Sequence, residues 1–370
     1  MVKLSDGKLF YEYSLDDIAG DMADLAGQIG EAFRLSAALT DQAVGKAHLA
    51  DEPLVQSFSR PNDFADYTEA QLLDFCKEQC SALLSKSEHL LNAMVAVSTL
   101  EVSKLFVSEK RELDQNYTWV NGESMSVELY EQYNFGSLDL GDLREEIASK
   151  MAEVKARFEA VKPDYPLSGT VILNKLELAD LFYNIASDLN FATVYSHSNL
   201  WSKGDAIQKD PQGDVIGITM AGQAEGSIRS SRFDNDGLSL GSVRIVDGGK
   251  AAAYYGSNRY GQYLGEIPTG ELRCLLADAG TVSADSFASG KYLEVVSMSG
   301  LQVDFYNDYI GGEVRLAYYH DGERKVPVTG VSISGKLSQV LDKIRFSSET
   351  AVEGGYFGPA KAALEDMTIF

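Results

Sequence analysis

The stretch KVPVTGVSISGKLSQVLDKI, which occupies residues 325–344, decides the fold of the second half of the chain. Its first part, from Val326 to Ile333, is rich in β-branched residues, which favour strands. Its second part has apolar side chains three or four positions apart, which is the period of a helix. The stretch therefore predicts a strand over 326–333 followed by a helix over 337–344.

The same stretch has the glycine and lysine spacing of a phosphate-binding loop, because Lys336 follows Gly330 and Gly335. Such a loop needs a serine or threonine at the next position, where its hydroxyl holds Mg²⁺, and this chain has Leu337 there. A strand that leads into a helix explains the glycines better than nucleotide binding does.

Further short strands are expected on the N-terminal side of this stretch, separated by turn-forming dipeptides such as Asp247-Gly248 and Asp321-Gly322. A strand over 170–173 and a helix with apolar residues from Leu178 to Leu189 precede them. The other expected strands are 215–219, 243–246, 301–306 and 314–319. We therefore expect residues 166–370 to form a β-rich, largely antiparallel domain.

The first 165 residues predict a mixed α/β domain. Apolar residues follow Ile18 at helical spacing, and Thr68 with Gln71 forms a capping box that predicts the start of a second helix. Between residues 94 and 133, β-rich segments flank Asn121-Gly122, which predicts a hairpin turn.

A third helix carries apolar residues from Leu143 to Val161. Pro163 and Pro166 follow it, and prolines are typical of helix ends and linkers. We place the domain boundary there, which divides the chain into 1–165 and 166–370. The fold class expected from the whole sequence is α+β.

The net charge of −23 excludes several classes of partner. Binding to nucleic acid depends on clustered Lys and Arg, and an anionic membrane surface also attracts basic residues. The N-terminus has no apolar run of the kind found in a signal peptide. Three cysteines do not make a disulfide framework, so we expect a cytoplasmic protein that binds neither nucleic acid nor membrane.

The histidines do not have the spacing of a helical zinc site, which places two of them one turn apart. They are His48, His89, His197 and His320. Cys76 and Cys80 lie four positions apart on a predicted helix, within its apolar stripe. This position favours buried small side chains over zinc ligands that act together with His89. The turn Asp234-Asn235-Asp236-Gly237 is not a calcium loop, because Arg232 and Val243 stand where oxygen ligands would be required.

An ordered series of segments resembles the TldD/PmbA family, whose members are also called "putative modulators of DNA gyrase". Ser168–Leu173, before a helix, is similar to the family's segment at the start of its C-terminal domain. Four further segments follow in the family's order. They are Arg232–Gly237 with Val243–Gly249, Tyr254–Gly270, Leu301–Glu313, and Lys325–Gly335, which is close to the family's "YPVEGVTIAGN".

This resemblance implies a bacterial cytoplasmic protein of two α+β domains that dimerises. In the peptidase branch of the family, an H-E-x-x-x-H helix and a cysteine near the C-terminus hold zinc. We expect the helix near residues 195–210, where only His197 is present, and the cysteine in Gly354–Pro359, which has none. The departure matches the PmbA/TldE branch, whose members lack these ligands and pair with, or resemble, a metal-bearing subunit.

Three functions follow from the resemblance. The first is a non-metal protein that binds peptide or unfolded segments as a homodimer or beside a TldD-like subunit, without catalytic residues or cofactor. The alternative is a metallopeptidase with an atypical site made from His197 and the carboxylates of Asp205, Asp210 or Asp214. The third is a protein-interaction modulator of DNA gyrase. For a peptide groove we choose Asp234, Asp236, Asn307 and Asp308, which lie on family-like loops and are also typical turn formers.

Overall fold

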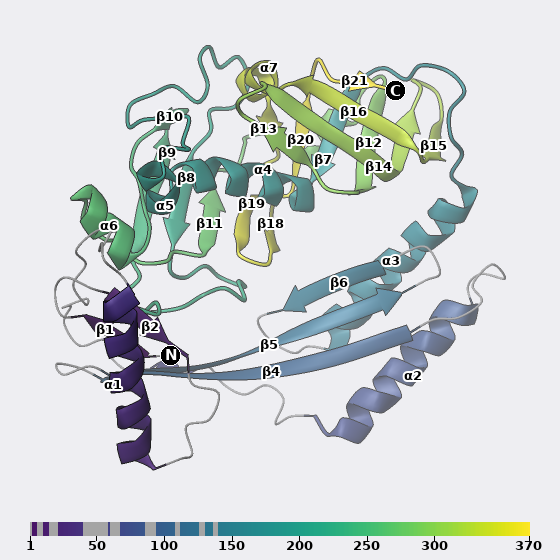
Figure 1. The fold of residues 1–370 in the computed structure, drawn as a ribbon. Coiled ribbons are helices and arrows are strands. Elements are labelled where there is room, and N and C mark those ends of the chain that lie inside the picture. Colours follow the sequence, from purple (N-terminus) through teal and green to yellow (C-terminus); the bar gives the residue numbers. More distant parts are fainter. Residues whose placement is uncertain are drawn as a thin grey trace.

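A computed structural model describes residues 2–5, 10–14, 21–39, 58–59, 67–85, 94–107, 112–125, 130–135 and 140–370. Figure 1 shows a four-stranded sheet with helices below two further sheets that the second half of the chain builds. The N-terminal elements are β1 (Val2–Ser5), β2 (Phe10–Tyr13), α1 (Met22–Leu39), β3 (Phe58–Ser59), α2 (Glu69–Ser85), β4 (Met94–Val107), β5 (Glu112–Met125), β6 (Tyr130–Phe135) and α3 (Leu140–Glu159).

The N-terminal half confirms the predicted capping box and contradicts the predicted hairpin turn. The amide of Thr68 donates to the Gln71 side chain at 2.8 Å, and the Gln71 amide donates back to the Thr68 hydroxyl at 3.3 Å. Asn121-Gly122, by contrast, lies inside β5, which pairs with β4 on one side and β6 on the other. The dipeptide was a misleading signal, because continuous pairing along both edges of β5 outweighs a local turn preference.

The third helix is shorter than expected. α3 ends at Glu159, so Val161 is not on its apolar face and forms an isolated parallel bridge with Val328 instead. Leu143 and Ile147 are buried as predicted. The division of the chain after residue 165 stays a prediction.

The C-terminal half consists of many short strands around a few helices. Its elements are β7 (Thr170–Asn174), α4 (Lys175–Asp188), α5 (Phe191–Tyr195), β8 (Ile218–Ala221), β9 (Ser242–Asp247), β10 (Lys250–Ala251), α6 (Asn258–Leu264), β11 (Cys274–Ala277), a 3-10 helix (Ala284–Phe287), β12 (Tyr292–Met298), β13 (Gln302–Asp304), β14 (Tyr309–His320), β15 (Lys325–Val328), β16 (Val331–Lys336), α7 (Leu337–Lys343), β17 (Arg345–Phe346), β18 (Thr350–Glu353), β19 (Tyr356–Pro359), β20 (Lys361–Leu364) and β21 (Thr368–Ile369).

These strands form a six-stranded sheet in the order β10-β9-β8-β11-β19-β18 and a nine-stranded sheet whose main path is β17-β20-β7-β12-β14-β16-β21. Within them, β11 with β19 and β7 with β12 are parallel, and the other strand pairs are antiparallel. The predicted α+β class with a β-rich, largely antiparallel C-terminal region is confirmed.

The stretch that opened the sequence analysis forms two strands rather than one. β15 and β16 pair with β14 in a single register, from His320 with Lys325 to Tyr309 with Lys336. The pairing is interrupted at Thr329, whose amide donates to the carbonyl of Val161 at 3.2 Å. Gly330 follows in the left-handed region, at φ 64°, which a glycine adopts without strain. The helix predicted after it is α7.

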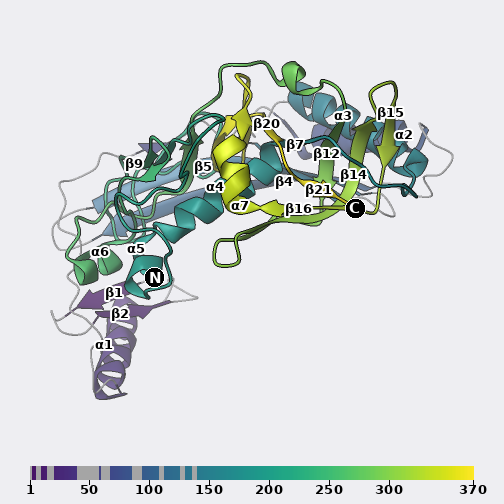
Figure 2. The same ribbon diagram turned by 90° about the horizontal axis from the view of Figure 1, so that it is seen from above.

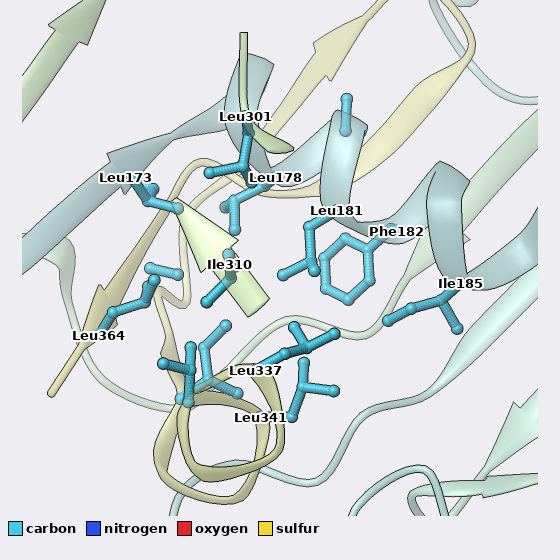
Figure 3. Packing of buried hydrophobic residues seen from close by; sticks show 14 of the residues in the cluster. Leu173, Leu178, Leu181, Phe182, Ile185, Leu301, Ile310, Leu337, Leu341 and Leu364 are labelled. Carbon is cyan, nitrogen blue, oxygen red and sulfur yellow. The ribbon is translucent and has the colours of Figure 1, made fainter. Parts of the chain in front are cut away.

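Helix α4 joins the two large sheets through one hydrophobic core. It packs against β7 and β20 of the nine-stranded sheet and against β18 and β19 of the six-stranded sheet. Figure 3 shows Leu181, Phe182 and Ile185 of α4 pointing toward residues of β14 and α7. The apolar spacing that predicted this helix therefore also places it at the centre of the fold.

The molecule is elongated. In Figures 1 and 2, α1 stands at one end, and α2 and β15 lie at the other. Within the described part of the chain, no helix has the length and apolar character needed to span a membrane.

Candidate functional site

Asp234 and Asp236, two of the four residues chosen for a peptide groove, lie in a loop that Asp234 organises. The Asp234 carboxylate accepts hydrogen bonds from the amides of Asp236 at 2.8 Å, Leu238 at 2.9 Å and Glu271 at 3.1 Å. Its side chain is buried, and this burial raises the pKa of the Asp234 carboxyl against the lowering effect of the amide donors. Asp234 therefore connects its own turn to the loop before β11.

Asn307 and Asp308, the other two groove candidates, also build a turn. The Asn307 side chain donates to Asp304 at 2.7 Å. The Asp308 carboxylate accepts from the amide and the hydroxyl of Ser338 at 2.7 and 2.8 Å, which satisfies the first turn of α7. Asp308 also lines a cavity of about 560 Å³ that Trp201, Phe305 and Leu337 border.

The two pairs of groove candidates belong to two different turns. The oxygens of Asp234 and Asp308 are used by backbone or hydroxyl donors of their own surroundings. Both residues do what turn-forming residues do, and Asp308 also borders the cavity beside α7.

His197 and the three carboxylates proposed beside it do not form a metal site. His197 is exposed at the end of α5, with φ 55°. Asp205 accepts from the Ser202 amide at 2.8 Å, Asp214 from the Phe346 amide at 2.6 Å, and Asp210 from the Gln212 side chain at 3.5 Å. Across the residues that the structure describes, which exclude His48 and His89, no three His, Cys, Asp or Glu side chains are grouped as a metal would require.

The segment over 195–210, where a zinc-binding helix was expected, is not helical. Only its first residue belongs to α5, and turns and bends follow. The helix that packs on the Gly354–Pro359 segment is α4, whose Phe182 stacks on Tyr356 with ring centroids 6.1 Å apart. The expected position of the helix was therefore wrong, because the sequence pattern does not show which helix covers a distant strand.

Tyr183 of α4 and Arg229 of the loop before Asp234 meet at this segment. The Tyr183 hydroxyl donates to the carbonyl of Arg273 at 3.0 Å, and the Arg229 guanidinium lies over the Tyr183 ring, 5.5 Å from its centroid. Gly355 fits between them, because a Cβ at this position would come within 2.4 Å of the Tyr183 hydroxyl and 2.7 Å of Arg229 Cδ.

The side chains around Gly355 do not fit a metal ion. Burial raises the pKa of Tyr183 above its usual range, and the charge of Arg229 opposes this shift without reversing it. Tyr183 is thus a neutral hydroxyl at neutral pH. A guanidinium beside it repels a second cation and has no lone pair to donate, so this arrangement suits an anion instead.

Sequence reasoning missed both residues. Tyr183 belongs to the apolar face of a helix, and Arg229 lies in the polar run SIRSSR, where no spacing distinguishes it. The sequence also contains a Gly-x-Ser-x-Gly spacing from Gly237 to Gly241. A strand, β9, follows it instead of the helix that a hydrolase nucleophile turn requires, and Ser239 bridges to Phe233.

Solved structures share this fold over nearly the whole chain. A "putative modulator of DNA gyrase" from Bacteroides thetaiotaomicron is 15% identical, with a TM-score of 0.79 over 99% of this chain and 87% of its own. One with the same description from Thermotoga maritima is 13% identical, with a TM-score of 0.73 over 100% and 88%. TldE from Thermococcus kodakarensis is 14% identical, with a TM-score of 0.72 over 95% and 85%.

No curated protein matches the sequence. A family model does, and it is described as the PmbA/TldA metallopeptidase C-terminal domain. The match covers residues 167–370, which is more than half of the chain. It includes β7, α4, the Arg229 loop and the β18–β19 hairpin. The chain therefore belongs to the TldD/PmbA family.

Proposed function

We propose that this chain is a PmbA/TldE-like member of its family that works without a metal and binds peptide or unfolded segments for proteolysis or peptide maturation. The main support is that Tyr183 and Arg229 lie against Gly355, in the segment where the resemblance puts the metal-binding cysteine. A site with a guanidinium and a neutral phenol cannot lower the pKa of an attacking water as bound zinc does.

An extended peptide would bind by pairing with a sheet edge. Among the described strands, β4 and β6 each pair only with β5, so each leaves one edge for another strand. In the view of Figure 1, β6 lies on the side of its sheet that faces the C-terminal half. Backbone hydrogen bonds at such an edge bind peptides with little dependence on sequence.

The protein would act in the cytoplasm as a homodimer or beside a TldD-like subunit that carries the metal. Cys76, Cys80 and Cys274, all of which the structure describes, form no disulfide, which suits a reducing compartment. A gene for an H-E-x-x-x-H protein next to the gene for this chain would support the paired arrangement.

Two measurements on the purified chain test this proposal. Elemental analysis after incubation with zinc is expected to find much less than one equivalent, and casein is expected to stay uncleaved with or without zinc. Stoichiometric zinc would contradict the proposal. Casein cleavage that is lost in His197→Ala would instead support the atypical metallopeptidase.

Contact with DNA gyrase is a second proposal, which the descriptions of two structural relatives favour. A net charge of −23 suits a basic protein surface and does not suit DNA. Gyrase should then co-purify with the chain from native lysate at low salt and be lost at high salt.

A further inference from the structure

The loop that carries Arg229 has no regular secondary structure, but several internal hydrogen bonds hold it. Its ends are joined by the Ser231 amide, which donates to the Gly222 carbonyl at 2.7 Å. Inside the loop, the Ser230 hydroxyl accepts from the Ala224 amide at 3.0 Å and donates to the Ala224 carbonyl at 2.9 Å. These bonds preset the backbone before any ligand arrives.

The loop is also fastened to the β18–β19 hairpin. The hydroxyl of Ser227, which is fully buried, donates to the Gly354 carbonyl at 3.0 Å and accepts from the Arg229 amide at 3.1 Å. On the hairpin itself, Lys175 donates to the carbonyl of Val352 at 3.3 Å. The base of the Arg229 side chain therefore has a fixed position against the hairpin turn.

Arg229 differs from two cations of neighbouring elements, Arg273 before β11 and Lys175 of α4. Arg273 forms an ion pair with Glu271 at 3.2 Å, and Lys175 forms one with Glu353 at 3.4 Å. No carboxylate among the described residues lies within ion-pair distance of Arg229, which is exposed. The chain has 55 acidic and 32 basic residues, so carboxylates are abundant in it. An exposed guanidinium on a hydrogen-bonded loop that nevertheless has no carboxylate partner among the described residues indicates a site for an external anion.

The geometry of the site selects among anions. The guanidinium is planar, and its Cζ lies 5.5 Å from the centroid of the Tyr183 ring, so the edge that faces away from the ring can offer two parallel N–H donors to a carboxylate. The ring excludes water from one face and strengthens the contact. Because the proposed ligand is a peptide, the available carboxylates are its C-terminal group and the side chains of Asp and Glu.

We propose that Arg229 binds a carboxylate of the peptide and so makes this protein selective for segments with a free C-terminus or an acidic side chain. The proposal rests on the peptide-binding function proposed above. Arg229 acts as a specificity-determining residue, and Tyr183 and Ser227 position it.

The test uses the full-length protein and four peptides of one alternating Val-Thr sequence with a neutral fluorescent label at the N-terminus. One peptide has a free C-terminal carboxylate, one is the C-terminal amide, and two further amides carry an internal Glu or Gln. Fluorescence anisotropy gives the Kd of each peptide for the wild type, Arg229→Gln, Arg229→Lys and Arg273→Gln. Arg273→Gln is the matched control, because it removes an exposed cation that lies directly before β11 and that Glu271 already neutralises.

We expect one carboxylate-bearing peptide to bind the wild type at least about tenfold more tightly than its neutral partner, a ratio typical of a charged hydrogen bond. Arg229→Gln should remove this ratio, Arg229→Lys should restore part of it, and Arg273→Gln should keep it. The acid–amide pair and the Glu–Gln pair show which carboxylate is bound.

Equal binding of charged and neutral peptides to the wild type would overturn the role of Arg229 and leave peptide binding intact. If Arg229→Gln and Arg273→Gln lose the affinity ratio to the same extent, the preference comes from long-range attraction between opposite charges. That result would also overturn the role of Arg229. If none of the four peptides binds, the proposed peptide-binding function fails, and this inference fails with it.

Discussion

Two neighbouring loops of the C-terminal half use charge in opposite ways. In the first, Asp234 is buried, and its oxygens accept three backbone N–H groups. In the second, Arg229 is exposed, and the bonds that hold its loop come from serine hydroxyls and backbone groups. A charge that the fold needs is surrounded by protein donors, whereas the guanidinium of Arg229 is left for a ligand. Each substitution below tests this difference.

The largest effect is expected at Asp234. Asp234→Ala leaves three donors in a buried region without acceptors, and it should lower the free energy of unfolding by roughly 3 kcal/mol or more. Urea unfolding measures this loss. Asp234→Asn, which keeps one acceptor oxygen, should lose less, and Asn235→Ala, at an exposed position of the same turn, should lose almost nothing. Equal losses in all three variants would contradict the organising role of Asp234.

A smaller loss is expected at Asp308. Its carboxylate accepts from Ser338 at the start of α7, and its backbone has φ 51°, which alanine adopts with strain, so Asp308→Ala should cost roughly 2 kcal/mol of unfolding free energy. Asp308→Asn keeps one acceptor and should lie between the wild type and Asp308→Ala. If the carboxylate serves mainly as a ligand contact on the cavity wall, Asp308→Asn, which suits the same backbone conformation, will not change the urea midpoint.

Glu349 is an exposed carboxylate that protein donors hold, and it gives a pH-dependent effect. Hydrogen bonds from the Ser283 hydroxyl and the Ala284 amide lower its pKa from the ordinary value of 4.5 to about 2. Because the folded pKa is the lower one, Glu349 stabilises the fold above about pH 4.5, and this contribution is lost as the pH falls toward 2.

The difference in urea stability between the wild type and Glu349→Gln should therefore be present at pH 7 and shrink at pH 3. A difference that is the same at both pH values would show that the carboxylate charge contributes nothing.

The smallest effect on stability is expected at Arg229. Arg229→Gln removes an exposed charge without an ion-pair partner among the described residues, so its free energy of unfolding should stay within about 0.5 kcal/mol of the wild type. Urea unfolding beside Asp308→Ala measures this. A loss larger than that of Asp308→Ala would mean that the fold itself depends on the guanidinium, and the comparison of the two loops would fail.

Much of the architecture could be predicted because it depends on local patterns. Apolar residues at helical spacing indicated α1, α4 and α7, and the reciprocal bonds of Thr68 and Gln71 are determined by residues three positions apart. The prediction failed where distant strands decide. Asn121-Gly122 has the composition of a turn, and its pairing with β4 and β6 makes it the middle of a strand.

The site divides in the same way. The sequence by itself determined the family, the turns at Asp234 and Asp308, and the lack of a cysteine in Gly354–Pro359, because each depends on residue types in a short segment. Only the tertiary structure decided that α4 covers that segment and that Arg229 lies on Tyr183 there. The physical reason is that these residues come from a helix, a loop and a hairpin, which meet only when the shared core between the two sheets is packed.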